Sequence, residues 1–132
     1  MTLKVLDRET MVKLQMEKAW ACMDECVDLV KLERWAGAAS RMYYAVFHAV
    51  CSLLIRDGHK VKSHKGANVV FSQHYIHTQK LPSEYGKLFR DLETLREESD
   101  YNCFYDVTEE EVIMRLEPAK KMIADIEKRL SE

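Results

Sequence analysis

The sequence predicts an all-α protein, an antiparallel up-and-down bundle of four long helices with one additional short helix. Apolar residues recur every three or four positions along most of the chain, which is the period of one helix face. Glycine and proline are scarce, at four and two residues, and they help to punctuate the chain. We expect residues 1–132 to form a single domain, because this length can bury a core without disulfide bonds or metal.

The first two helices are the longest periodic stretches. One helix is expected from about Asp7 to Leu32, and its apolar face comprises Val12, Met16, Ala19, Met23, Val27 and Val30. The periodicity resets at Glu33-Arg34-Trp35, and a second helix is expected from about Trp35 to Arg56. Asp57-Gly58 ends that helix, because glycine readily adopts the left-handed conformation found after helix ends.

Three further helices have their own boundary signals. Ser63 is a suitable N-cap for a short third helix that runs through about His74. Pro82 is tolerated at the start of a fourth helix, expected from about Ser83 to Ser99. Thr108-Glu109-Glu110-Glu111 forms a capping box for the last helix. Pro118 lies inside that last helix and is expected to bend or split it.

Composition narrows the function classes. Twenty basic and 22 acidic residues give a net charge of −2, so nucleic acid would have to bind at a local patch. The longest uninterrupted apolar runs are only a few residues, which predicts no membrane-spanning helix, and the first residues lack the apolar region of a signal peptide. We therefore expect a cytoplasmic protein with no membrane partner and with reduced thiols at Cys22, Cys26, Cys51 and Cys103.

The segment 39–50 places polar residues on one line of an otherwise apolar helix. Arg41 and His48 are seven residues apart, almost two helical turns. Tyr44 lies between them on the same stripe. Two interpretations stay open for this stripe: a polar seam satisfied by another helix, or a functional site.

The fourth helix carries a matching polar stripe near its end. Arg96 and Asp100 are four residues apart, and Tyr101 follows. Because a buried arginine needs a carboxylate, we expect the two stripes to meet, with Asp100 paired to Arg41 or to Arg96.

Two smaller features suggest ligand chemistry. His64-Lys65-Gly66 open the third helix, where free amides and the helix dipole favour a phosphate; an ordinary turn and cap is the alternative. The pairs His74/His77 and Cys22/Cys26 each supply two metal ligands, but neither has the further ligands of a closed site. We expect no metal and no cofactor, and the sequence contains no phosphate-binding glycine loop, nucleophile elbow or paired-acid motif.

Three motifs follow one another along the chain: Arg41 to His48 (RMYYAVFH), Ser63 to Gly66 (SHKG) with Phe71 following, and Leu95 to Tyr101 (LREESDY). Taken in this order, they resemble the motifs of small stand-alone HEPN proteins of bacteria and archaea. The resemblance covers about residue 15 to residue 130 and implies a helical bundle that is usually dimeric. Many HEPN proteins are metal-independent RNases, often the toxin paired with a minimal nucleotidyltransferase antitoxin. Others are non-catalytic modules associated with RNA or nucleotides.

The resemblance also bears on catalysis. Catalytic HEPN domains carry an arginine near the end of a late helix, followed after four to six intervening residues by a histidine. Arg96 stands at that place, but Tyr101, Asn102 and Cys103 occupy the positions of the histidine. The resemblance therefore favours a binding module, a homodimer associated with RNA, a nucleotide or a nucleotidyltransferase partner. In that interpretation the phosphate or nucleotide contacts come from Tyr44, His64, Lys65 and Gly66.

The alternative is a metal-independent endoribonuclease. His48 would take the proton of the 2′-hydroxyl, and Arg41 or Arg96 would stabilise the charged transition state. Asp100 and Tyr101 would complete that site. In either case we expect a homodimer, because the aromatic residues exceed what a four-helix core readily hides. The residues behind this expectation are Phe47, Tyr85, Phe89, Phe104 and Tyr105.

Overall fold

The computed structural model describes residues 5–61 and 63–132, and of Val5 and Leu6 only the backbone. Within these ranges it contains α-helices, one short π-helical segment and no strand, so the predicted all-α fold is confirmed. The elements are α1 (Val5–Lys31), α2 (Trp35–Arg56), α3 (His64–Phe71), η1 (Ser72–Ile76), α4 (Ser83–Tyr101) and α5 (Glu109–Leu130).

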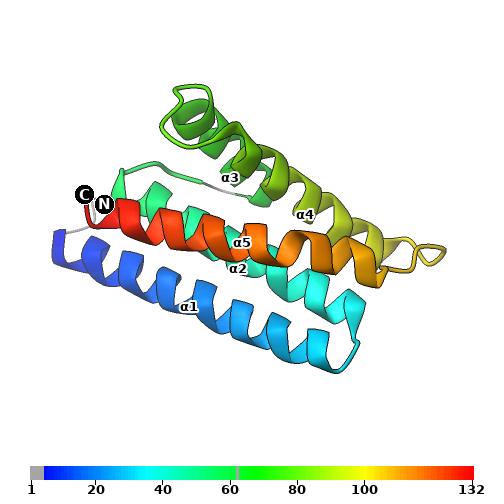
Figure 1. Ribbon diagram of the computed structural model, residues 1–132. Helices are drawn as coiled ribbons and strands as arrows, with labels where there is room; N and C mark the ends of the chain where they lie inside the picture. The colour runs from blue at the N-terminus through cyan, green and yellow to red at the C-terminus, as the bar shows by residue number, and fades with distance from the viewer. Residues whose placement is uncertain (1–4, 62) are drawn as a thin grey trace.

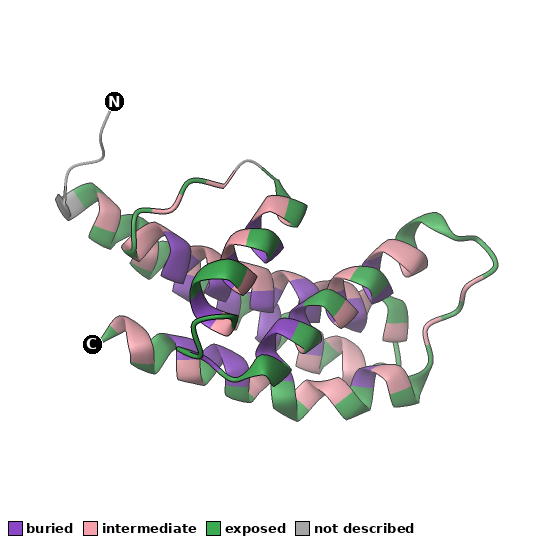
Figure 2. Cartoon of the chain, turned by 90° about the horizontal axis from the view of Figure 1, so that it is seen from above, coloured by how far each residue is buried: buried purple, intermediate pink, exposed green. Residues whose placement is uncertain are grey.

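Helix α2 lies at the centre of the bundle. It packs against α1, α3, α4 and α5. Figure 1 shows α1 and α4 running one way and α2 and α5 the other, which is the predicted up-and-down arrangement. The end of α5 lies near the first turns of α1, and the loop between α4 and α5 projects at the opposite end. In Figure 2 the buried residues line the inner faces of the helices, while that projecting loop is mostly exposed.

The composition of α2 suits its central place. By length and composition it is the one helix of the described chain that could cross a membrane, a feature that the short apolar runs concealed. However, 61% of its most apolar stretch is buried inside the bundle, as in the core helix of a soluble protein. The buried residues of α2 are Ala38, Ala39, Met42, Tyr43, Ala45, Val46, Ala49, Val50, Ser52, Leu53 and Leu54.

The predicted caps are confirmed. Ser63 Oγ accepts a hydrogen bond from the Gly66 amide at 2.9 Å and so begins α3. Thr108 and Glu111 form the reciprocal capping box of α5, in which each side chain accepts a hydrogen bond from the other residue's backbone amide.

Two predictions about the later helices differ from the structure in detail. Helix α4 continues to Tyr101, slightly beyond the expected end near Ser99, so Tyr101 is a helical residue. Of the two effects expected of Pro118, a bend or a split, the split is wrong, because α5 runs through Pro118 as one element. A proline cannot donate to the carbonyl four residues earlier, here that of Met114. Since both residues are exposed, solvent can hydrogen-bond that carbonyl, and the helix persists.

The surface argument for a dimer was partly wrong. Phe89 and Tyr85 are buried in the core, and Phe47 and Tyr105 are half-buried against it. Of those five aromatic residues, Phe104 is the exposed one, at 95%.

The four cysteines are free thiols. Burial raises the pKa of the Cys26 thiol to about 11 and that of Cys51 to about 12, so both stay protonated near neutral pH. Cys103 is exposed in the loop after α4.

Candidate functional site

Arg96 is a buried cation near the end of α4, and its guanidinium lies against two tyrosines of α2. The residue is 9% exposed, and its Cζ lies 5.0 Å from the ring centre of Tyr43 and 5.7 Å from that of Tyr44. One turn later, Asp100 Oδ2 accepts a hydrogen bond from Arg96 Nη1 at 3.1 Å. Burial alone would lower the pKa of Arg96, but Tyr44, Tyr101, Tyr43 and Asp100 outweigh it and raise that pKa.

Two buried polar atoms of this region have no hydrogen-bond partner among the described residues. They are Nε of Arg96 and Oε2 of Glu93, both on α4. Burial, and then the charge of Glu93, raises the pKa of Tyr43, so its phenol stays protonated. Buried polar groups are nearly always hydrogen-bonded, so an unpaired donor and an unpaired acceptor distinguish this region from ordinary apolar core.

His64, the first residue of α3, lies against the same two tyrosines. Its Nδ1 is 2.8 Å from the hydroxyl oxygen of Tyr43. The imidazole stacks on the ring of Phe47 with centres 4.2 Å apart and meets Tyr44 edge-on at 5.9 Å. A protonated Tyr43 that donates to Nδ1 leaves the hydrogen of a neutral His64 on Nε2. His64 and Arg96 therefore come from different helices to the same pair of tyrosine rings.

The guanidinium of Arg41 also contacts the ring of Tyr44. Its Cζ lies 5.4 Å from the ring centre of Tyr44, so the two guanidiniums of Arg41 and Arg96 share one tyrosine ring. Its ion partner is Glu25 of α1, with Nη1 and Oε2 3.6 Å apart. The expected pairing of Asp100 is therefore met by Arg96, and the option of Arg41 with Asp100 was wrong.

His48 turns away from Arg96 toward α1. Its Nδ1 lies 2.7 Å from Oε1 of Gln15, an acceptor, so Nδ1 donates and a neutral ring keeps its lone pair on Nε2. Burial lowers the pKa of His48, and the nearby charges of Lys18, His64 and Arg41 lower it further. The imidazole is thus neutral near pH 7.

Lys65 and Gly66 do not join this group. The Gly66 amide donates to Ser63 Oγ, so this amide forms the cap that was the alternative to a phosphate contact. Lys65 is exposed and lines a shallow groove between α3, η1 and α4, together with Arg90 and Glu93.

The structure thus defines one cluster, which we call the tyrosine platform. It comprises Arg41, Tyr43, Tyr44, Phe47, His64, Arg96 and Asp100. Sequence reasoning missed Tyr43 and Phe47, because both lie beside the Arg41–Tyr44–His48 line rather than on it. The signal was present as two adjacent tyrosines in an otherwise apolar helix, one of which had to face the core.

Metal chemistry has no obvious location. Among the described residues, no three His, Cys, Asp or Glu side chains gather as a metal site would require.

A known protein family and several known proteins are similar to this chain. The model of the HEPN domain matches residues 12–129 of the chain. The chain belongs to the HEPN domain family. This HEPN domain is 29% identical over 126 residues to a "UPF0332 protein" of Thermotoga maritima, a match that covers 96% of each chain.

Two archaeal proteins are also similar to this HEPN domain. A protein of Methanocaldococcus jannaschii, named "Putative toxin MJ0142", is 27% identical over 113 residues, covering 84% of this chain and 77% of its own. A "UPF0332 protein" of Archaeoglobus fulgidus is 27% identical over 109 residues, covering 83% and 86%.

Proposed function

We propose that this HEPN domain is an RNA- or nucleotide-associated module of the toxin–antitoxin type, which binds its ligand with little or no cleavage. The observation that supports this most is the buried guanidinium of Arg96 between Tyr43, Tyr44 and Asp100. Proteins bind single-stranded RNA by combining cations for phosphates with aromatic or guanidinium planes for bases. The tyrosine platform offers both.

Two exposed aromatic side chains lie beyond Arg96 along the chain. Tyr101, at the end of α4, is 80% exposed, and Phe104 in the next loop is 95% exposed. Tyr101 is close enough to Arg96 to raise its pKa, so a base could stack on Tyr101 while a phosphate meets the basic groups of the platform.

The residues around Arg96 favour binding over cleavage. A catalytic HEPN domain would have a histidine at one of the positions that Tyr101, Asn102 and Cys103 occupy here. None of these three supplies an imidazole for acid–base chemistry. The similarity to a protein named as a toxin supports membership of a toxin–antitoxin pair, with a minimal nucleotidyltransferase as the proposed partner. Homodimerisation is part of the proposal, and the exposed side chain of Phe104 supplies apolar surface for it.

Fluorescence anisotropy with labelled single-stranded RNA tests this function. We expect the wild type to bind with an affinity that falls steeply as salt rises, and to leave the RNA intact. Arg96→Gln should weaken binding about tenfold, as expected for one lost charge-assisted contact. Lys121→Gln, which removes the same charge from an exposed position of α5, should have a small effect. Equal losses in both variants, or no RNA or nucleotide binding by the wild type, would contradict the proposal.

A second candidate function rests on a separate observation. Arg41 and Arg96 contact the same Tyr44 ring, and His48 presents a neutral imidazole one helical turn from Tyr44. These three residues could act as the base and the cations of a metal-independent endoribonuclease. Cleavage assays on His48 and Arg96 variants separate this function from simple binding.

A further inference from the structure

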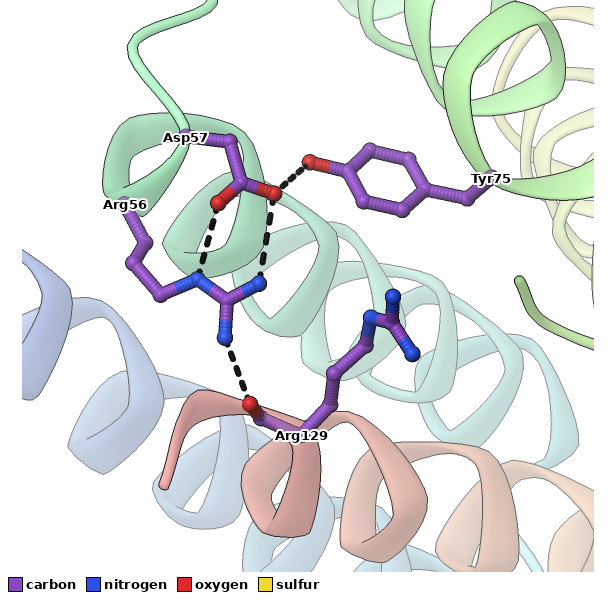
Figure 3. A network of polar contacts seen from close by, with 4 residues as sticks. All are labelled: Arg56, Asp57, Tyr75 and Arg129. Carbon is purple, nitrogen blue, oxygen red and sulfur yellow. Dashed lines mark hydrogen bonds and ion pairs between the residues drawn. The ribbon is translucent and has the colours of Figure 1, made fainter. Parts of the chain in front are cut away.

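A second group of basic side chains surrounds Tyr75 at the far end of α2. Figure 3 shows its polar core: Asp57, at the end of α2, contacts both Arg56 and Tyr75. Arg56 binds the carboxylate through Nε at 2.9 Å and Nη2 at 3.3 Å, and it donates through Nη1 to the backbone carbonyl of Arg129. The buried phenol of Tyr75 donates to Asp57 Oδ2. The charge of Asp57 is therefore already balanced by Arg56.

Two further cations near Tyr75, Arg129 and Lys80, form no ion pair with a carboxylate of the residues that the structure describes. Arg129 extends its guanidinium from α5 toward the Tyr75 side of the network (Figure 3). Its buried Nε has no hydrogen-bond partner among the described residues, and Nη1 makes a long 3.4 Å contact with the carbonyl of Lys80. The ammonium of Lys80 lies 5.9 Å from the Tyr75 ring centre. The positive charges of Lys80 and Arg129 thus lie near Tyr75, and the carboxylate that Tyr75 contacts, Asp57, is already neutralised by Arg56.

Two histidines adjoin these cations. The rings of His59 and His74 stack with centres 4.2 Å apart and planes 28° apart. His59 also meets Tyr75 edge-on at 6.1 Å. Burial lowers the pKa of His59, and the neighbouring His74 and Lys80 lower it more than Asp57 raises it. The stack therefore places two imidazole rings side by side, and their ring N–H groups can donate to an anion.

The backbone is irregular at this end of the molecule. Segment η1, which holds His74 and Tyr75, is π-helical, and such turns occur mainly as single interruptions at functional positions. Gln79 has a positive φ of 61°, a conformation that costs energy in a residue other than glycine. It directly precedes Lys80. The chain thus accepts two unfavourable local conformations beside the residues that surround Tyr75, which is independent support for a functional role.

We propose that Arg129, Lys80, His59 and His74 form a binding site for a terminal phosphate group, the phosphate monoester of a nucleotide or of an RNA 5′ end. A guanidinium binds phosphate oxygens through two parallel N–H donors, and an ammonium adds a point charge. A dianionic phosphate would match the positive charges of Arg129 and Lys80, and the two imidazole rings would add N–H donors. This site is separate from the tyrosine platform and does not depend on the function proposed for it.

NMR titration of the full chain tests this site. The His59 and His74 ring resonances are followed during separate additions of inorganic phosphate, of AMP, and of an oligoribonucleotide that carries either a 5′-phosphate or a 5′-hydroxyl. We expect inorganic phosphate to shift the His59 and His74 resonances in a saturable way. The larger ligand that naturally supplies the phosphate, either the nucleotide or the RNA, should bind more tightly than inorganic phosphate. An RNA source requires the 5′-phosphate form to bind more tightly than the 5′-hydroxyl form.

Two variants localise the binding. Lys80→Gln and Arg129→Gln should each weaken it about tenfold. Lys80 is exposed, and the carbonyl of Arg129 that accepts from Arg56 is retained, so both variants should keep the helical circular dichroism spectrum. Lys87→Gln, an exposed charge on α4, is the control and should bind as the wild type does.

The outcomes also separate this site from the tyrosine platform. Arg96→Gln should leave the phosphate-induced shifts of His59 and His74 unchanged. Absence of saturable shifts with every ligand, or equal affinities of Lys80→Gln, Arg129→Gln and Lys87→Gln, would overturn the proposal, whatever happens to RNA binding at Arg96.

Discussion

Tyr43 and His64 are joined by a 2.8 Å hydrogen bond between Oη and Nδ1, although 21 positions separate them in the chain. This bond fastens the first residue of α3 to the central helix of the bundle. It also fixes the imidazole against Phe47, where the rings stack. The position of His64 on the tyrosine platform therefore depends on the buried phenol of Tyr43.

Removing that phenol hydroxyl should loosen His64. We expect Tyr43→Phe to lower the free energy of unfolding by about 1 kcal/mol, the net contribution of one hydrogen bond. It should also change the ring resonances of His64 in NMR spectra. Tyr44→Phe is the matched control, because it removes a hydroxyl from the neighbouring ring, and its effect should be smaller. Equal effects of the two variants would show that the Tyr43–His64 bond contributes nothing special.

The ribonuclease alternative makes a separate prediction. If the chain cleaves RNA through these groups, His48→Ala and Arg96→Ala should each lower the rate by a factor of about 10²–10⁴, the usual contribution of an acid–base group. A chelator should make no difference. The measurement is cleavage of labelled single-stranded RNA on gels. Unchanged cleavage in both variants would remove these residues from the reaction, and absence of cleavage by the wild type would leave the binding function.

The pH dependence of stability follows from His48. Its pKa is lowered in the folded chain, chiefly by burial, whereas the unfolded chain has the ordinary value of about 6.5. Below that value the unfolded state binds the proton more readily, so the contribution of His48 is fully present above about pH 7 and is lost as the pH falls toward 5. Between pH 8 and pH 5, the free energy of unfolding measured with denaturant should therefore fall by more in the wild type than in His48→Gln. A larger loss in the variant would contradict the sign.

The capping box of α5 can be tested by a single substitution. Thr108→Ala removes the side-chain acceptor of the Glu111 amide and should lower the free energy of unfolding by about 1 kcal/mol. Thr94→Ala, at an exposed position inside α4, is the control. It should be neutral or slightly stabilising, because alanine is the better helix former. Both effects are measured by urea denaturation, and a Thr94→Ala loss as large as that of Thr108→Ala would refute a special role of the cap.

The proposed homodimer can be examined at the exposed loop. We expect light scattering at micromolar concentration to give twice the chain mass. Phe104→Asp should shift the population toward the monomer, because it places a charge on the most exposed aromatic side chain of the described chain. Leu32→Asp, in the turn between α1 and α2, is a matched exposed apolar control. A monomeric wild type would remove the dimer from the proposal.

Local signals in the sequence predicted local structure well. The caps at Ser63 and Thr108, and the pairing of Arg96 with Asp100 one turn later, depend only on residues three or four positions apart. Helical spacing alone therefore determines which of these groups can meet. The all-α fold was accessible for the same reason, since each helix carries its own apolar period.

Contacts between helices were not accessible in this way. The Arg41–His48 stripe was predicted correctly as a line, but α2 is rotated so that His48 meets Gln15 of α1, while Tyr44 meets Arg96 of α4. That rotation is set by the fit of many core side chains at once, which the spacing of one helix does not encode. For this reason the ion partner of Arg41 is Glu25 on α1 rather than Asp100 on α4.

The π-helical turn of η1 makes one short segment intolerant of any change in length. Each residue added to or removed from a helix rotates everything beyond it by about 100°. Phe71 and Tyr75, on either side of this turn's start, are both buried and stack with ring centres 5.7 Å apart. Deletion of one residue within 72–74, between Phe71 and Tyr75, would change the rotation between these two side chains by about 100° and turn Tyr75 away from Asp57. A deletion in the exposed loop after α4 would leave that register untouched.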